Sequence, residues 1–341
     1  MDRLLESWEL GGVEVANRVV LAPLAGIGNW FVRLQAKRYG AGLTVSEMVS
    51  SHGLAYGDKR TRTEFLRLHP EEGPTSVQLF GADPEIMREA AAMVADAGAD
   101  LIDLNMGCPV KKVCRTGAGS ALLNDKDTAV AVAAAAREGS GLPVTVKLRP
   151  GIKPGDRDGV VLAQRLQDEA GVAGIAFHPR HASQQHKGLP DYALGREVVE
   201  QLDVPVMISG GLMSEEKARK VMDLTGAEAI LLARGSLGNP WLFERVLGSR
   251  EGDPTIDEVL AELSWVIDRC GEHYPESETS GRAARYLRKF YPWYLERLKE
   301  IDGEWFTRAR LNDVNQALQK TESLDEARAA IAAIELPVAA L

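Results

Sequence analysis

Eight short apolar runs, separated by stretches of helical periodicity, occupy the chain from residue 19 to about residue 245. The runs are Val19–Ala22, Leu43–Val45, Ser76–Leu79, Leu101–Leu104, Val144–Leu148, Gly174–Phe177, Val206–Ile208 and Ala229–Leu232. Almost all are continuous rather than alternating, which is typical of parallel strands buried on both faces. The intervening segments predict helices, among them Pro84–Ala97, Lys126–Arg137, Gly159–Ala170 and Ser214–Leu224. Eight such units predict an α/β protein with a (β/α)8 TIM barrel.

A doubly wound sheet is the alternative fold for alternating strands and helices. That fold usually carries G-x-G-x-x-G directly after its first strand. Here Gly117-Ala118-Gly119 is followed by Ser120-Ala121-Leu122, so the third glycine is missing, and no predicted strand ends just before it. The sequence therefore favours the barrel.

The pattern changes after Gly248. Residues 254–335 show helical periodicity without a convincing strand, and residues 248–254 read as a linker. We expect a catalytic TIM-barrel domain over residues 1–248 and a small all-α domain over residues 249–341.

Composition places the chain among ordinary globular proteins, with 45% hydrophobic and 26% charged residues in 341. No apolar run reaches membrane-spanning length, and the N-terminus lacks the charged-then-apolar order of a signal peptide. Cys108, Cys114 and Cys270 form neither an even framework nor a Cys-x-x-Cys pair. We therefore expect a cytoplasmic protein with reduced thiols and no membrane association.

The net charge of −9 argues against nonspecific nucleic-acid binding by the whole surface. The charge is unevenly distributed, however. Residues 251–278 carry nine acids against one base, whereas residues 282–310 carry eight bases against four acids. A polyanion can still bind at such a local basic stretch.

The active site of a TIM barrel is built at the carboxyl ends of its strands. Polar or glycine-rich groups stand at most of these ends: Pro23-Leu24-Ala25-Gly26, Ser46-Glu47, Gln78, Asn105, Lys147, His178, Ser209-Gly210-Gly211 and Ala233-Arg234-Gly235. The last two groups occupy the positions where barrel enzymes often bind phosphate. Glycine backbone can approach an anion closely, and an arginine adds a planar, permanent charge. Taken separately, Gly210-Gly211 could be a tight turn and Arg234 a surface ion pair. Because both stand at the two positions typical of phosphate sites, we favour phosphate binding.

Lys147 and His178 are ambiguous from their own positions. A lysine in an apolar strand is costly without a partner, and it is compatible with a Schiff base, an electron-rich cofactor or a salt bridge. His178 is equally compatible with a packing role. His181 and His186 lie nearby, but no carboxylate stands at a matching spacing, so we expect no metal site.

The segment Asp103-Leu104-Asn105-Met106-Gly107-Cys108-Pro109 is the sharpest local feature. It places Cys108 directly after a strand end, whereas most cytoplasmic thiols are small buried packing groups. A thiol at the barrel mouth is mostly protonated at neutral pH, so it can donate a proton as well as act as a nucleophile.

Six segments resemble the tRNA-dihydrouridine synthase family, most closely its bacterial B-type group. They are Ala22–Gly26, Leu43–Met48 (LTVSEM), Asp103–Pro109 (DLNMGCP) with Lys111-Lys112-Val113, Gly117–Leu123 (GAGSALL), Val144–Arg149 (VTVKLR) and Arg234–Phe243 (RGSLGNPWLF). With the helical tail, the resemblance covers essentially the whole chain, and the DLNMGCP–KKV–GAGSALL block is highly specific.

This resemblance implies FMN in the barrel mouth. The matching positions place Pro23, Leu24, Ala25 and Gln78 at the flavin ring, Lys147 and His178 at its pyrimidine side, and Ser209, Gly210, Gly211, Ala233 and Arg234 at its phosphate. Cys108 matches the catalytic cysteine, and Asn105 matches the asparagine that orients the target base. The implied reaction reduces the C5–C6 double bond of a uridine in tRNA, with hydride from reduced FMN to C6 and a proton from Cys108 to C5. NADPH is the implied reductant.

The chain departs from the family pattern at several positions. Ser209 replaces a frequent Asn, Ala233 replaces a Gly, and His178-Pro179-Arg180-His181 replaces His-Gly-Arg-Thr. Arg180, in the last of these, is a candidate substrate residue. In the tail, Arg282, Arg285, Arg288 and Lys289 recur at three- and four-residue spacing, which predicts one basic helix face. We expect Arg288 and Lys289 to bind the tRNA backbone.

Other classes of function remain open from the sequence. One is a small-molecule flavin oxidoreductase of the dihydroorotate or dihydropyrimidine dehydrogenase type on the same barrel. Another is a flavin-free lyase that uses Lys147 as a Schiff-base amine. A non-catalytic tRNA-binding module would leave Cys108 and the strand-end groups unexplained. We expect a monomer with FMN, NADPH and tRNA as its ligands.

Overall fold

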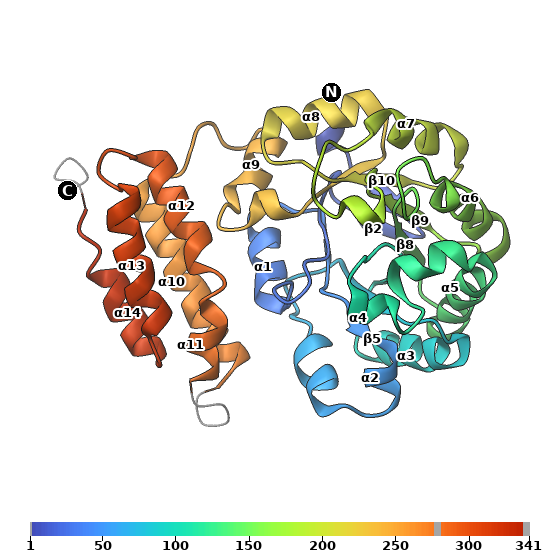
Figure 1. The fold of residues 1–341 in the computed structure, drawn as a ribbon, viewed down its shortest axis with the longest axis horizontal. Helices are drawn as coiled ribbons and strands as arrows, with labels where there is room; N and C mark the ends of the chain where they lie inside the picture. The colour runs from blue at the N-terminus through green and yellow to red at the C-terminus, as the bar shows by residue number, and fades with distance from the viewer. Residues whose placement is uncertain (1, 276–280, 337–341) are drawn as a thin grey trace. The chain divides into compact units, whose positions relative to one another are not determined.

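Eight parallel strands close into a barrel in the computed structural model, which describes residues 2–275 and 281–336 (Figure 1). Around the barrel the order is β3, β4, β6, β7, β8, β9, β10 and β11, and β11 pairs again with β3. The strands are β3 (Val19–Leu21), β4 (Leu43–Val45), β6 (Thr75–Phe80), β7 (Leu101–Asn105), β8 (Val144–Leu148), β9 (Gly174–Phe177), β10 (Val206–Ser209) and β11 (Ala229–Leu232). The predicted TIM barrel is confirmed, with each predicted run on a barrel strand. A short further strand, β5 (Val49–Ser50), pairs with β6 beyond β4 and was not predicted.

Helices connect the strands around the barrel. They are α1 (Trp30–Arg38), α2 (Ser51–Ala55), α3 (Pro84–Asp96), α4 (Lys111–Cys114), α5 (Lys126–Ser140), α6 (Asp158–Arg165), α7 (Tyr192–Gln201) and α8 (Glu215–Thr225). Local chemistry sets several of their ends. The side chain of Asp83 accepts backbone N–H groups at the start of α3, and Gly141 ends α5 in the left-handed conformation at φ +67°. The predicted helix 159–170 is observed as α6 followed by a wider π-helical turn over Leu166–Ala170.

An N-terminal hairpin packs into the amino end of the barrel. Its strands are β1 (Trp8–Leu10) and β2 (Val13–Val15), paired antiparallel. Trp8, Leu10 and Val15 join one buried cluster with the inward-facing side chains of the barrel strands. This apolar packing fills one end of the barrel, so the polar side chains gather at the carboxyl ends of the strands.

The chain divides into two compact units, the first ending at Gly235 and the second beginning at Ser236. The division precedes α9 (Trp241–Leu247), whereas the sequence placed the boundary at residue 248. The other helices of the second unit are α10 (Ile256–His273), α11 (Arg282–Leu287), α12 (Tyr291–Ile301), α13 (Arg308–Lys320) and α14 (Leu324–Ala332). The helical character predicted after residue 254 is confirmed for the described residues.

The single basic helix face expected over residues 282–289 is wrong in one respect. Helix α11 ends at Leu287, and Arg288 is its C-terminal cap residue. Pro292 lies in the first turn of α12, where its missing N–H has no helical partner to lose. The basic residues are therefore divided between a helix and the turn that follows it. Among the described helices, none is both long and apolar enough to cross a membrane.

Candidate active site

A chain of hydrogen bonds crosses three neighbouring strands at the mouth of the barrel. Gln78 on β6, Asp103 on β7 and Thr145 on β8 stand in register. Gln78 Nε2 donates to Asp103 Oδ2 at 2.6 Å, and the Thr145 hydroxyl donates to Asp103 Oδ1 at 2.7 Å. Asn105 Nδ2 donates to Gln78 Oε1 at 2.9 Å. The structure thus joins two residues predicted for different roles, Gln78 and Asn105, through direct contact.

Cys108 lies at the end of this chain of contacts. Its backbone N–H donates to Asn105 Oδ1 at 2.9 Å, and its carbonyl accepts the Ser120 N–H at 3.0 Å and the Cys114 thiol at 3.3 Å. A side chain at Gly119, where φ is +63°, would place Cβ 2.7 Å from the Cys108 carbonyl oxygen. Glycine is therefore required for this close approach. The loop that carries the thiol is fixed at both its amide and its carbonyl.

The Cys108 thiol is half-buried. Burial raises its pKa above the ordinary value, and the nearby Cys114 raises it further, against the opposing effects of a backbone contact at Val110 and of the Arg149 and Lys147 charges. A raised pKa keeps the thiol protonated at neutral pH. The environment suits a proton donor better than a thiolate nucleophile.

Lys147 stands opposite Asn105 in the β7–β8 register. Its ammonium makes no hydrogen bond or ion pair with any residue in the described ranges 2–275 and 281–336. Burial, with repulsion from Arg149, lowers the pKa of Lys147 to about 8, while Asp103 and Cys108 oppose the shift. The residue is therefore a cation near neutral pH with its donors directed to no protein acceptor.

The turn Gly210–Gly211 after β10, called the glycine cradle below, lies beside the end of β11. Gly210 and Gly211 adopt φ values of +103° and +75°. A Cβ at Gly210 would lie 2.6 Å from the His178 ring, and one at Gly211 would lie 3.1 Å from the Tyr192 hydroxyl oxygen. The Tyr192 hydroxyl donates to the Gly210 carbonyl at 2.6 Å. This turn admits only glycine at these two positions, so no side chain separates a ligand from the backbone N–H groups.

A buried polar atom without a partner lies beside the cradle. Ser209 is 3% exposed, and its Oγ has no hydrogen-bond partner among residues 2–275 and 281–336. An unpaired buried hydroxyl is costly, so a ligand that hydrogen-bonds to it would be stabilised. Arg234 is exposed, and its guanidinium makes no hydrogen bond or ion pair to the described part of the chain. Both observations fit an anionic group held between the two strand ends.

Arg180 and His178 lie beside the Gly210–Gly211 turn at the mouth, and only Arg180 adds charge there. Arg180 Nε and Nη2 donate to the Gly188 carbonyl, and Nη1 lies 3.3 Å from His178 Nε2. Burial lowers the pKa of His178, and the charges of Lys147, Arg149 and Arg180 lower it further, so the imidazole is neutral. Arg180 Nη1 would lie 3.6 Å from a Cβ at Gly210. Arg180, predicted as a substrate residue, thus stands close to the glycine cradle.

Three residues of this mouth were not predicted as site residues: Asp103, Thr145 and Arg149. Arg149 is 5% exposed and donates from Nη1 to the carbonyls of Arg180, His181 and Gln185 at 3.1–3.3 Å. Burial lowers its pKa to about 10. Its contacts fix the loop after β9. The signal available in the sequence was alternation, because Asp103 stands two positions before Asn105 and Arg149 two positions after Lys147.

The loop after β3, which carries Pro23, Leu24 and Ala25, is fixed by two charged side chains. Glu47, which follows β4, accepts the Gly26 N–H at 2.9 Å. The Arg33 guanidinium donates to the Gly28 carbonyl at 2.9 Å, and Gly28 N–H in turn donates to the Leu24 carbonyl at 2.7 Å.

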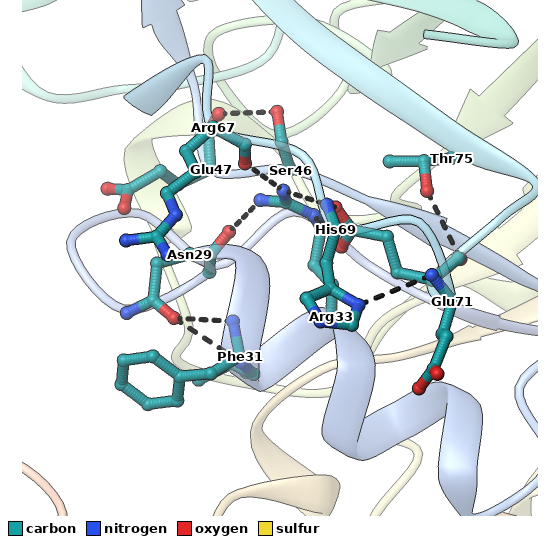
Figure 2. Close-up of polar contacts among 12 residues, drawn as sticks. Asn29, Phe31, Arg33, Ser46, Glu47, Arg67, His69, Glu71 and Thr75 are labelled. Atoms are coloured by element: carbon teal, nitrogen blue, oxygen red, sulfur yellow. Dashed lines mark hydrogen bonds and ion pairs between the residues drawn. The ribbon is translucent and has the colours of Figure 1, made fainter. Parts of the chain in front are cut away.

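Figure 2 shows Arg33 among these polar contacts, with Asn29, Ser46 and Glu47 nearby. Leu24 is buried, Pro23 is partly exposed and Ala25 is exposed. The predicted flavin-ring loop is therefore a rigid turn. Among the described residues, no group of three or more His, Cys, Asp or Glu side chains could hold a metal ion.

Comparison with known proteins agrees with this geometry. The family model described as "Dihydrouridine synthase (Dus)" matches residues 20–335. The chain belongs to the dihydrouridine synthase family. It is 36% identical over 325 residues to the tRNA-dihydrouridine synthase B of Shewanella oneidensis, covering 92% of this chain and 95% of that one. It is 40% identical over 295 residues to the enzyme of the same name from Xanthomonas axonopodis pv. citri, covering 84% and 86% of the two chains.

Solved structures with similar folds are barrel enzymes. A 2-naphthoyl-CoA reductase complex matches with a TM-score of 0.59 at 14% identity, over 73% of this chain and 52% of that one. A morphinone reductase variant in complex with tetrahydroNAD matches with a TM-score of 0.55 at 17% identity, over 75% and 93%. The chain thus spans about half the length of the naphthoyl-CoA reductase chain. These likenesses show the fold, whereas membership of the dihydrouridine synthase family makes the chain an oxidoreductase.

Proposed function

We propose that this dihydrouridine synthase reduces the C5–C6 double bond of uridines in tRNA to 5,6-dihydrouridine. The observation that carries the proposal is the placement of a protonated thiol, Cys108, against Asn105 and across from the Lys147 strand, at the mouth of the barrel. The curated relatives at 36–40% identity that are named tRNA-dihydrouridine synthase B support it. A uridine of a folded RNA has to be unpaired or leave its stack before its base can enter such a mouth.

FMN is the proposed cofactor, and the residues present fit it. The Gly210–Gly211 backbone, the unpaired Ser209 hydroxyl and Arg234 are suited to its phosphate. Pro23, Leu24, Ala25 and Gln78 are proposed to contact the flavin ring, with Lys147 and His178 at its pyrimidine side and Ala233 beside the phosphate. When bound and reduced, FMN supplies the hydride that adds to C6 of the uracil ring, and NADPH is the proposed reductant.

Cys108 and Asn105 are the proposed substrate-side residues. The Cys108 Sγ–H gives its proton to C5 of the base, and the raised pKa keeps that proton in place until the reaction requires it. Asn105 orients the base by hydrogen bonding. Lys147 holds a positive charge beside the site at which negative charge develops. Neutral His178 adds a polar contact without adding charge.

Arg180 is proposed to contact the substrate within the barrel mouth, and the basic residues Arg288 and Lys289 of the second unit are proposed to contact the RNA backbone. Guanidinium and ammonium groups bind phosphates and release counterions. We also propose that the protein acts in the cytoplasm as a monomer, where its thiols stay reduced.

A direct assay tests the function. Purified protein, FMN and NADPH are incubated with tRNA that lacks dihydrouridine, and the nucleosides are measured by mass spectrometry after digestion. We expect dihydrouridine to form in tRNA with the wild-type protein and not with Cys108→Ala. Mapping the modified positions then identifies which uridines are reduced. Reduction of free dihydropyrimidine precursors such as orotate or uracil, with no reaction on tRNA, would favour the small-molecule oxidoreductase instead.

A further inference from the structure

Asp103 is a buried carboxylate to which the proposed reaction assigns no role. It is 2% exposed, at the third of the five positions of β7, and it accepts hydrogen bonds from Gln78 Nε2 at 2.6 Å and the Thr145 hydroxyl at 2.7 Å. Burial raises its pKa to about 6, against those two contacts and the Lys147 charge. Placing a carboxylate there costs free energy, which calls for an explanation in terms of its contacts.

The contacts of Asp103 determine the orientation of two amide side chains. An ionised carboxylate only accepts hydrogen bonds, so Gln78 must turn Nε2 toward it and Oε1 away. Oε1 then accepts from Asn105 Nδ2 at 2.9 Å, so Asn105 must turn Oδ1 in the other direction. That oxygen receives the Cys108 N–H at 2.9 Å and the Gly107 N–H at 3.3 Å. All of these hydrogen bonds therefore point the same way: the Cys108 N–H donates to Asn105, Asn105 donates to Gln78, and Gln78 donates to Asp103.

The direction of these hydrogen bonds determines which donor or acceptor of the Asn105 amide remains for a ligand. Its Oδ1 receives two backbone N–H groups, and one N–H of Nδ2 is given to Gln78. Within the described part of the chain, the remaining N–H has only the Met48 sulfur as a partner, at 3.8 Å, and a thioether is a weak acceptor. Asn105 is therefore left as a donor. A donor matches a carbonyl oxygen of uracil and opposes the exocyclic amino group of cytosine.

We propose that Asp103 is a positioning residue that fixes the amides of Gln78 and Asn105, so that Asn105 presents an N–H donor to the target base and holds the Cys108 loop. The inference rests on the proposed function and deepens it. Asp103 touches neither the base nor the reacting atoms. Its effect passes through Gln78 to Asn105, whose N–H donor matches the O4 carbonyl of uracil and would meet an amino group at the same ring position of cytosine.

Four variants separate acceptor geometry from charge and from packing. Asp103→Leu removes the acceptor. Asp103→Asn can still present an oxygen to Gln78 while its NH2 donates to the Thr145 hydroxyl, which can accept. Thr145→Val removes only the second contact to the same carboxylate. The double variant Asp103→Asn with Thr145→Val leaves the new NH2 without an acceptor, so one buried polar group must stay unpaired in either orientation.

The turnover of dihydrouridine formation at saturating tRNA is the first readout. We expect Asp103→Leu to lower kcat about a hundredfold, with NADPH oxidation without tRNA changed far less, because misplaced reacting groups cost about that much. Asp103→Asn and Thr145→Val should each cost about tenfold at most. The turnover of the double variant should be at least about tenfold lower than the product of the two single-variant effects predicts, since residues within one hydrogen-bond network are coupled.

The second readout uses flavin-free protein, with folding checked by thermal melting. Hydrogen exchange at the Cys108 amide and alkylation of the Cys108 thiol, both followed by mass spectrometry, should accelerate in Asp103→Leu and in the double variant but not in Asp103→Asn. If Asp103→Asn lowers the turnover of dihydrouridine formation as much as Asp103→Leu does, the charge of Asp103 rather than its acceptor oxygen matters, and the proposal is overturned. If the loss of turnover in the double variant equals the product of the losses in the two single variants, the proposed positioning role of Asp103 is also overturned. If wild-type protein makes no dihydrouridine, the proposed function fails, and the exchange and alkylation rates still decide whether Asp103 fixes the loop.

Discussion

The backbone N–H of Cys108 donates to the side-chain oxygen of Asn105, three residues earlier, at 2.9 Å. The proposed proton donor and the proposed base-orienting amide are therefore one connected unit rather than two independent groups. The Ser120 N–H and the Cys114 thiol hold the same loop at the Cys108 carbonyl. A change at any of these positions is expected to act on where the thiol lies.

Cys108→Ala should retain FMN and its reduction by NADPH while nearly abolishing dihydrouridine formation. The thiol gives a proton to the substrate and contributes little to flavin affinity, and loss of a general acid typically costs 10²–10⁴-fold. The measurement is single-turnover reaction of pre-reduced enzyme with tRNA. Cys270→Ala is the matched control, because it removes a buried thiol of the second unit and should leave the rate unchanged. Equal rates for Cys108→Ala and wild type would leave Cys108 as a packing residue.

Arg234→Ala should weaken FMN binding and yield protein with little yellow colour. Its guanidinium makes no hydrogen bond or ion pair within the described residues, so the loss is assigned to the ligand. A charge-assisted contact to phosphate contributes about 1.5–3 kcal/mol, or roughly 10- to 150-fold in Kd. Titration of flavin-free protein with FMN measures it. Arg196→Ala, which breaks only the surface ion pair with Glu200, should leave Kd unchanged. A fully yellow Arg234→Ala protein would place the phosphate elsewhere.

The pH dependence of the tRNA-reducing step should report Lys147. Burial lowers its pKa to about 8, so the cation is present below that pH and is lost as pH rises through it. The rate should therefore be level near pH 7 and fall above about pH 8. The Cys108 pKa is raised, so its own loss of a proton lies at higher pH. Lys147→Arg keeps its charge at every accessible pH and should remove this fall. The same profile in wild type and Lys147→Arg would contradict the assignment.

The barrel was predictable because its signal is local and repeated. Continuous apolar runs such as Ala229–Leu232 bury both faces of a strand, and their spacing leaves room for one helix each. The same logic found Gln78, Asn105 and Lys147, since a strand end in a barrel faces the mouth. Cys108 stood out because it follows such an end directly.

What the sequence did not reveal depends on pairing across the chain. Asp103 gains its role from Gln78 and Thr145, which are 25 and 42 residues away along the chain. Arg149 gains its role from carbonyls of a loop more than 30 residues later. Backbone carbonyls leave no mark in a sequence. The end of α11 at Leu287 was missed because helical spacing of charges continues through a turn.

The ion pair between Arg33 and Glu72 should be the most sensitive charged pair of the first unit. Both side chains are at most 1% exposed, and Arg33 donates to the two Glu72 carboxylate oxygens at 2.7 and 3.0 Å (Figure 2 shows Arg33 within its polar surroundings). Arg33→Met strands a buried carboxylate, which should lower the free energy of unfolding by about 3–5 kcal/mol. Denaturant unfolding measures it. Arg196→Met at an exposed pair should change it by about 0.5 kcal/mol or less. A small effect at Arg33 would mean that Glu72 finds another partner.

The last prediction separates two neighbouring basic residues of the second unit. The Arg288 guanidinium donates to the Thr321 carbonyl at 3.1 Å, and the Arg288 carbonyl accepts from Gln319 Nε2 at 2.8 Å. Arg288 therefore holds the end of α11 to the end of α13. Lys289 is exposed, with Nζ 4.4 Å from the centre of the Tyr286 ring. Of the two, Lys289 is the better placed to meet a phosphate group.

The double variant Arg288→Ala with Lys289→Ala should weaken tRNA binding and flatten its log–log salt dependence by roughly one to two units. Lys289→Ala alone should account for most of that change, because removing one phosphate contact lowers the slope by about one. Arg288→Ala alone should chiefly lower the thermal stability. Lys299→Ala, which breaks a surface pair with Glu296, is the control and should leave the slope unchanged. FMN content and NADPH oxidation without RNA should stay normal in all of them. If Lys289→Ala binds tRNA with the wild-type affinity and slope, this surface does not bind RNA, and a small-molecule substrate becomes the better explanation of the barrel mouth.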